Sequence, residues 1–214
     1  MPEPLLILGA GGHGRALIEL LHDLPGYVLA GLVDRDPTPR AMLGVPVLGD
    51  EAILPGLFAG GVRLACIAIG DNGARLAAAI RLETLGFTLP ALVHPSAIMA
   101  RSAQLGPGTV VLPRAVLGAL VRVGRLAIIN TGAIAEHDTV VGEGAHIGPG
   151  AALSGGVRVG ARALVGAGAA CRPYVTIGED AVIGTGAGVV ADVRAGMRVG
   201  GVPARPLAPP CLPR

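Results

Sequence analysis

The chain has 214 residues, with 35 Gly, 18 Pro, no Trp and an aromatic content of only 2%. A core so poor in aromatic side chains must be built from Val, Ile, Leu and Ala in tight layers, which favours a narrow, repetitive architecture. The net charge is only +2 and the basic residues, all of them Arg, are scattered, so the composition gives little support for nucleic-acid binding.

Hydropathy and cysteine content indicate in which cellular compartment the protein is found. The mean hydropathy of +0.64 is high, but Gly, Pro and Arg interrupt every apolar stretch well before the roughly 18 residues that a spanning helix needs. Residues 1–12 lack the basic region of a signal peptide. Cys66, Cys171 and Cys211 form no CxxC motif, and an odd count argues against a disulfide framework. We therefore expect a cytoplasmic protein without a membrane partner.

The first 90 residues alternate between short apolar strands and amphipathic helices. Such alternation implies a parallel sheet with right-handed crossovers. Because 90 residues hold only half of a full dinucleotide-binding fold, we expect a small Rossmann-like α/β domain over residues 1–90. Its expected strands are 5–8, 28–33 and 64–69, and its expected helices are 15–21 and 74–85.

A glycine-rich loop, Gly9–Gly14, follows the first strand and opens the first helix. It fits the pattern GxGxxG, and Asp34 lies about twenty residues further on. Glycines at these places let backbone N–H groups approach a diphosphate at the helix N-terminus. The loop therefore predicts a nucleotide site, with a tight turn that binds nothing as the alternative. No second domain for hydride transfer follows, which argues against NAD-dependent redox chemistry.

From residue 92 to Val199 the chain follows a six-residue period, through what reads as eighteen uninterrupted hexads. The second residue of each hexad is apolar, from Val93 to Ala195, and is expected to point inward. The sixth residue is small, and Gly is frequent at the third and fifth places, where it permits tight turns. The period predicts a parallel β-helix with three hexads per coil over residues 91–205, followed by a Pro-rich tail, 206–214.

One corner of the repeat is occupied by the charged triplet Glu136, His137 and Asp138, where neighbouring hexads have small residues. A solvated corner is one interpretation. An imidazole, however, titrates near neutral pH and can take a proton from an amine or a hydroxyl, and an adjacent carboxylate can orient the ring and favour its protonated state. The triplet therefore indicates a general base. His146 opens its own hexad, so its side chain should face outward.

The hexads, the opening 7–14 (ILGAGGHG) and the closing 201–205 (GVPAR) together resemble a family of bacterial hexapeptide-repeat acetyltransferases. This family includes nucleotide-aminosugar N-acetyltransferases and sialic acid O-acetyltransferases, and the resemblance covers essentially the whole chain. It implies a left-handed β-helix, against the usual crossover rule. It also implies acetyl-CoA as the acetyl donor, a nucleotide-linked sugar as the acceptor and no metal.

The resemblance also implies roles for individual residues. His137 is the base and Asp138 supports it, while His146 hydrogen-bonds the thioester region of acetyl-CoA and the Gly155 N–H faces the developing oxyanion. Two further residues match positions lining the pantetheine groove, namely Ala167 and Thr185. Six residues match positions that bind the nucleotide sugar, namely Gly12, His13, Gly14, Asp34, Arg35 and Gly70.

The repeat length has a consequence for assembly. His137 and His146 are about half a coil apart, so they lie on opposite sides of one prism and cannot meet within one chain. They can meet where prisms pack side by side around a threefold axis, each subunit presenting one histidine. We therefore expect a homotrimer with sites shared between subunits.

Two other classes of protein remain open. Trimeric γ-type carbonic anhydrases share this helix and hold zinc with three imidazoles, but here His94 lies coils away from His137 and His146. A non-catalytic nucleotide-sugar binder or scaffold would need neither the charged corner nor His146.

Within the acetyltransferase interpretation, we expect the acceptor to be the amine of a nucleotide-linked sugar of the UDP-4-amino-6-deoxy type, because the glycine loop suits a diphosphate. A sugar hydroxyl, including that of sialic acid, is the alternative. Cys171 falls on an inward position and Cys211 in the Pro-rich tail, so we expect direct transfer without an acyl-enzyme.

Overall fold

The computed structural model describes residues 1–36, 38 and 40–207. Contacts divide the chain into two compact units, Met1–Pro95 and Ser96–Arg214, and each is described by itself. Most of the expected tail, including Cys211, lies outside the described residues. Within the described ranges, no helix has the length and hydropathy that crossing a lipid bilayer requires.

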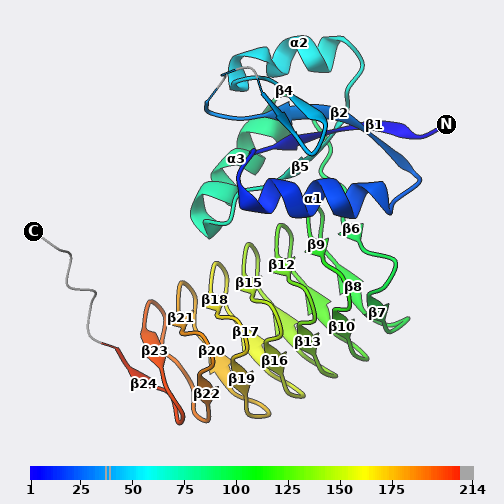
Figure 1. Cartoon of the computed structure of the whole chain (residues 1–214). Helices are drawn as coiled ribbons and strands as arrows, with labels where there is room; N and C mark the ends of the chain where they lie inside the picture. The colour runs from blue at the N-terminus through cyan, green and yellow to red at the C-terminus, as the bar shows by residue number, and fades with distance from the viewer. Residues whose placement is uncertain (37, 39, 208–214) are drawn as a thin grey trace, which may run out of the picture. The chain divides into compact units, whose positions relative to one another are not determined.

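The first unit is a five-stranded sheet in the order β3-β4-β2-β1-β5, accompanied by three α-helices (Figure 1). The central strand β1 pairs in parallel with both β2 and β5, and Leu5, Leu6 and Ile7 within it are fully buried. The strands are β1 (Glu3–Leu8), β2 (Tyr27–Val33), β3 (Ala41–Met42), β4 (Val45–Gly49) and β5 (Leu64–Ile67), with β6 (Leu92–Val93) at the end of the unit. The helices are α1 (Gly12–His22), the 3-10 helix η1 (Glu51–Ile53), α2 (Leu54–Ala59) and α3 (Asn72–Thr84).

The all-parallel sheet expected for this unit is wrong at one edge. β3 and β4 form an antiparallel hairpin, joined by Leu43 and Gly44, both of which have positive φ, 49° and 81°. Two successive left-handed residues make the tight turn whose twist matches that of paired strands. Elsewhere the carboxyl ends of β1, β2 and β5 meet at one edge of the sheet, and the loops that follow them come together there.

The second unit is a β-helix whose short strands stack into three parallel sheets (Figure 1). Each strand pairs with the strand one coil further on, as Val116 does with Ile134 and Ile134 with Ala152. The first sheet contains β7 (Ile98–Met99), β10 (Val116–Leu117), β13 (Ile134–Ala135), β16 (Ala152–Leu153), β19 (Ala170–Cys171) and β22 (Gly188–Val189). The second contains β8 (Gln104–Leu105), β11 (Arg122–Val123), β14 (Val140–Val141), β17 (Arg158–Val159) and β20 (Thr176–Ile177). The third contains β9 (Val110–Val111), β12 (Ile128–Ile129), β15 (His146–Ile147), β18 (Leu164–Val165), β21 (Val182–Ile183), β23 (Arg198–Gly200) and the antiparallel β24 (Arg205–Pro206).

The backbone conformation at the corners of this helix explains the residue pattern of the hexads. The fifth residue of the hexad has positive φ at each corner from Gly108 to Gly186, whether or not it is glycine. Non-glycine residues in this conformation include Asp138 (φ 61°) and Tyr174 (φ 63°). The second residues, such as Val111 and Ile147, are fully buried, so their side chains fill the prism as expected.

The expectation that the period runs to Val199 without interruption is wrong in the last coil. Ile177 is bridged to Val193 and Ile183 pairs with Val199, so this coil is two residues shorter than the others. Val193 is buried and Ala195, expected to point inward, is exposed. The Asp192 side chain accepts the Thr176 N–H at 2.8 Å, in the place of the carbonyl that the shortened corner no longer supplies.

Candidate active site

His137 and Asp138 form a hydrogen-bonded pair at the corner between β13 and β14. His137 Nδ1 lies 2.8 Å from Asp138 Oδ2, and both side chains are more than half exposed. The left-handed backbone of Asp138 turns its side chain back beside the ring, and its N–H donates to Ala119 O one coil away at 2.9 Å. With Nδ1–H donating to the carboxylate, Nε2 carries the free lone pair, which is the arrangement that a general base needs.

Gly155 lies directly beside this imidazole, one coil further on. A Cβ at position 155 would sit 2.5 Å from both Cε1 and Nε2 of His137, so only glycine leaves room for the ring. Gly155 is buried, and in the described part of the chain its N–H has no hydrogen-bond acceptor. An accepting nitrogen and a donating N–H therefore lie side by side at one corner, which can serve proton removal and oxyanion stabilisation together.

His146 lies on another side of the prism, as the first residue of β15, and is half-buried. Its Nε2 is 3.0 Å from the amide nitrogen of Asn130, on the neighbouring coil. An amide N–H donates, so His146 Nε2 accepts and its ring proton belongs to Nδ1. Sequence reasoning missed Asn130, although an amide at the third place of a hexad, usually a glycine, was a detectable signal. No contact joins His146 to His137 among the described residues.

Ala167 and Thr185 occupy one corner column, between the third sheet and the first. Ala167 follows β18 and Thr185 follows β21, and the Gly186 N–H donates to Ala167 O at 2.8 Å. Both therefore continue from the sheet that carries His146, one and two coils further on.

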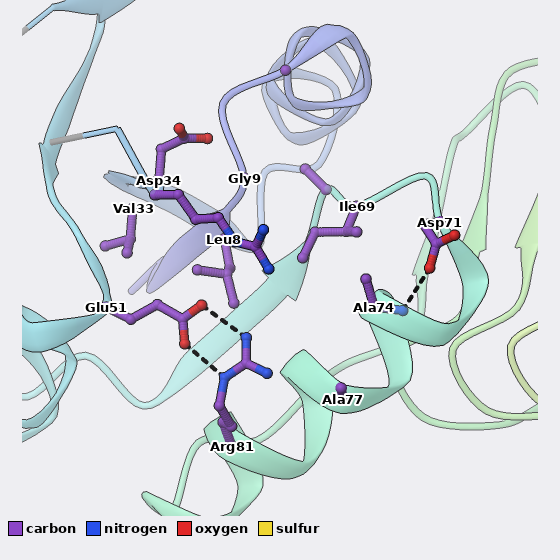
Figure 2. Close-up of a pocket in the computed structure, with 13 residues that line it drawn as sticks. Leu8, Gly9, Val33, Asp34, Glu51, Ile69, Asp71, Ala74, Ala77 and Arg81 are labelled. Carbon is purple, nitrogen blue, oxygen red and sulfur yellow. Dashed lines mark hydrogen bonds and ion pairs between the residues drawn. The ribbon is translucent and has the colours of Figure 1, made fainter. Parts of the chain in front are cut away.

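The first unit contains a cavity of about 420 Å³ at the carboxyl edge of its sheet (Figure 2). Apolar and charged side chains share its wall. The lining residues are Leu8, Gly9, Gly11, Val33, Asp34, Arg35, Glu51, Ala68, Ile69, Asp71, Ala74, Ala77 and Arg81. Of the six residues predicted to bind the nucleotide sugar, Asp34 and Arg35 line the cavity, whereas Gly12, His13, Gly14 and Gly70 do not.

The glycine loop beside this cavity is held in a tight conformation. Gly9 has φ 112° and a Cβ there would lie 2.8 Å from Ala68 O, while one at Gly14 would lie 2.8 Å from Gly9 O. The N-cap residue of α1, Gly11, supplies no side-chain cap. The Gly14 N–H donates to Gly11 O at 3.0 Å, whereas the N–H groups of Gly12 and His13 have no acceptor among the described residues and could donate to an anion.

Asp34 anchors the loop from the next strand. Its carboxylate accepts the Ala10 N–H at 2.6 Å and the Asp36 N–H at 3.1 Å, and pairs with Arg40 at 3.1 Å. Partial burial opposes ionisation, but these hydrogen bonds and the charge of Arg40 hold the pKa of Asp34 below its ordinary value. The carboxylate is therefore already engaged with the protein.

His13 has a buried nitrogen without a partner. Its Nε2 has no hydrogen-bond partner among the residues that the structure describes. Burial, reinforced by the charge of Arg75, lowers the pKa of His13 to about 4, so the ring is neutral at physiological pH. Arg75 is itself buried and donates to Ile69 O, Gly70 O and Asn72 Oδ1 at 2.9, 3.2 and 2.8 Å. An unpaired buried polar atom costs about 1–3 kcal/mol, which a bound ligand can offset.

A zinc site in the β-helix would need several ligating side chains close together. The described residues contain no cluster of three or more His, Cys, Asp or Glu side chains arranged to hold a metal ion.

Comparisons with known proteins identify relatives of both units. Residues 4–82 match the family described as the PglD N-terminal domain, and residues 138–173 match the bacterial transferase hexapeptide family. The structure of a variant perosamine N-acetyltransferase from Caulobacter crescentus, in complex with CoA and GDP-perosamine, is 43% identical over 96% of this chain and 97% of that one, with a TM-score of 0.94. The acetyltransferase domain of PglB from Neisseria gonorrhoeae, in complex with acetyl coenzyme A, is 37% identical over 97% and 100%, with a TM-score of 0.90.

A UDP-N-acetylbacillosamine N-acetyltransferase from Bacillus subtilis is 35% identical over 113 residues, about half the length of each chain. The two structural likenesses cover nearly the whole chain. They confirm the expected fold, a small Rossmann-like α/β domain followed by a left-handed parallel β-helix.

Proposed function

The chain belongs to the hexapeptide-repeat family of bacterial nucleotide-aminosugar N-acetyltransferases, and we propose that it transfers acetyl from acetyl-CoA to the amine of a nucleotide-linked 4-amino-6-deoxy sugar. The observation that carries the proposal is the juxtaposition of His137 Nε2 and the Gly155 N–H at one corner. One group can accept a proton while the other stabilises negative charge within the same few ångströms.

In the proposed reaction, acetyl-CoA supplies an acetyl group already activated as a thioester. The lone pair of the sugar amine attacks the thioester carbonyl carbon and forms the new C–N bond, while His137 Nε2 removes a proton from that amine. The Gly155 N–H donates to the carbonyl oxygen while that oxygen carries negative charge. Cleavage of the C–S bond expels the CoA thiolate, and His137 returns its proton to that sulfur. Asp138 holds the ring in the tautomer that leaves Nε2 free to accept.

Direct transfer is preferred over an acyl-enzyme because of where the described thiols lie. Cys66 and Cys171 are both buried. Burial raises the pKa of the Cys66 thiol and raises that of Cys171 to about 12. A thiol that is both buried and protonated is a poor nucleophile.

Trimerisation is part of the proposal, and the side chains on the three sheets support it. Four of the five outward residues of the second sheet are polar and exposed, namely Gln104, Arg122, Arg158 and Thr176, and the fifth, Val140, is half-buried. Those of the first sheet are apolar, namely Val116, Ile134, Ala152 and Ala170. On the third sheet, Leu164 and Val182 follow His146. Packing the prisms side by side around a threefold axis would bury these apolar faces.

That packing brings the two histidines together. The outer end of each sheet is the end away from the corner of Ala167. His137 lies at the outer end of the first sheet, beyond Ala135. His146 is the first residue of its strand and so lies at the outer end of the third sheet. When the first sheet of one subunit packs against the third sheet of the next, both outer ends border one groove. That groove would receive acetyl-CoA. The buried free thiols, and acetyl-CoA and a nucleotide sugar as substrates, fit a cytoplasmic enzyme.

The proposal is tested by following thiol release from acetyl-CoA with a panel of sugars. Nucleotide-linked 4-amino-6-deoxy sugars should release thiol, and the product should carry the acetyl group on nitrogen by mass spectrometry and NMR. Turnover confined to free sugars, or acetylation confined to hydroxyls, would overturn the assignment of the acceptor.

A further inference from the structure

The cavity of the first unit contains three carboxylates, and two of them are already used to hold backbone. Asp34 accepts the Ala10 N–H and the Asp36 N–H, and Asp71 caps α3 by accepting the Ala74 N–H at 2.8 Å. Glu51 differs, because its partner is the side chain of Arg81, which can also face a ligand. It is therefore the carboxylate most available to a bound molecule.

Glu51 and Arg81 form a two-pronged ion pair across the cavity, between η1 and α3 (Figure 2). Arg81 Nε and Nη2 donate to the two carboxylate oxygens at 2.7 and 2.8 Å. The third guanidinium nitrogen, Nη1, has no partner among the described residues, and each carboxylate oxygen keeps a second lone pair. Their side chains are 30% and 45% exposed, so a ligand in the cavity can reach both.

The surroundings of the pair suit a planar, uncharged ring. Ala74 and Ala77 are small, and together with Ile69 and Leu8 they give the cavity apolar walls. A diphosphate would be repelled by Glu51 and attracted to the glycine loop at Gly9 and Gly11, which line the same cavity. A nucleotide with its phosphates at the loop would therefore extend its base toward the ion pair.

We propose that Glu51 and Arg81 select the nucleobase, accepting a base with an N–H beside a C=O and rejecting one with an amino group beside a bare ring nitrogen. Glu51 Oε1 accepts the ring N–H, and Arg81 Nη2, which uses only one of its two protons in the ion pair, donates the other to the adjacent carbonyl. Guanine and uracil present this edge. Adenine and cytosine present the reverse order, which would place an acceptor against Glu51 and a donor against Arg81. The inference rests on the proposed function and names which nucleotides that site takes.

Isothermal titration of the intact protein with GDP, UDP, ADP and CDP tests it without any acetyl transfer. GDP, UDP or both should bind at least about ten-fold more tightly than ADP and CDP, the order expected for one two-point base contact. Comparison of GDP with UDP identifies which of the two bases is preferred. A preference for ADP or CDP, or equal affinity for all four, would overturn the inference.

Glu51→Gln supplies the decisive comparison, because its amide can donate where the carboxylate only accepts. The ratio of GDP or UDP affinity to ADP affinity should fall about ten-fold or more toward one, whereas an equal loss for all four nucleotides would show a merely structural role. Glu143→Gln breaks an ion pair of similar length, with Arg125 at 3.2 Å in the second unit, and should leave every affinity unchanged. Wild-type protein that binds none of the four contradicts nucleotide recognition as a whole. Normal selectivity without acetyl transfer contradicts only the proposed function.

Discussion

The imidazole of His137 occupies the space that a side chain at Gly155 would need, since a Cβ there would lie 2.5 Å from His137 Nε2. Gly155 does not have the left-handed backbone of the neighbouring Gly156, so the absence of a side chain serves the ring and not the turn. The glycine therefore fixes the base and the N–H donor relative to each other.

Gly155→Ala should consequently displace His137 while the β-helix remains folded. We expect kcat to fall by about 10²-fold, within the range for losing a general base, with little change in melting temperature. The control is the same substitution in a His137→Ala background, where most of the effect should already be absent. Full activity in Gly155→Ala would mean that the ring does not need its observed position.

His137→Ala should lower kcat by roughly 10²- to 10⁴-fold and leave acetyl-CoA affinity nearly unchanged, because the base faces the acceptor. Asp138→Asn should lower kcat less, since the amide can still contact Nδ1 but no longer fixes its proton. His146→Ala should instead weaken acetyl-CoA binding together with turnover. Steady-state kinetics and titration with CoA separate these cases, and near-normal turnover of His137→Ala would refute its role.

Replacing Cys66, Cys171 and Cys211 together by Ala or Ser should keep turnover within several-fold of the wild type. The reason is that the proposed reaction forms no bond to sulfur of the enzyme. Circular dichroism checks that the triple variant is folded. A folded variant without activity would favour a covalent route.

His13 predicts a stability that declines in mild acid. Its pKa is lowered from 6.5 to about 4 in the folded protein, so the unfolded chain binds the extra proton more readily between these values. The stabilisation is complete above pH 6.5 and is lost as the pH falls through about 4, by at most about 3 kcal/mol. Urea denaturation at a series of pH values should show a smaller decline for His13→Gln. Identical profiles would contradict the burial of a neutral ring.

The hexad period predicted most of the β-helix because every coil repeats one local environment, with buried residues such as Val111 and left-handed corners. It failed at Ala195 because a shortened corner, closed by Asp192, keeps the same residue types while moving the register by two. The hairpin of β3 and β4 was missed because its turn places Leu43 in a left-handed conformation that Leu rarely adopts.

The candidate site shows the same division between local and distant signals. His137 and Asp138 were found because they interrupt a repeat. The approach of Gly155 to the ring and the contact of Asn130 with His146 depend on stacking of neighbouring coils. Glu51 and Arg81, thirty residues apart in the sequence, follow no local pattern at all and are joined only by the tertiary fold.

Shared sites between subunits are tested most directly by mixing two inactive chains. Neither His137→Ala nor His146→Ala should form a complete site with copies of itself. In randomly mixed trimers, about a quarter of the interfaces would pair an intact His137 with an intact His146 from the neighbouring chain. Specific activity of the mixed, trimer-sized peak should therefore recover to about a quarter of the wild-type value. A monomeric mass by light scattering, or a mixed trimer as inactive as its two parents, would contradict a site formed across the interface.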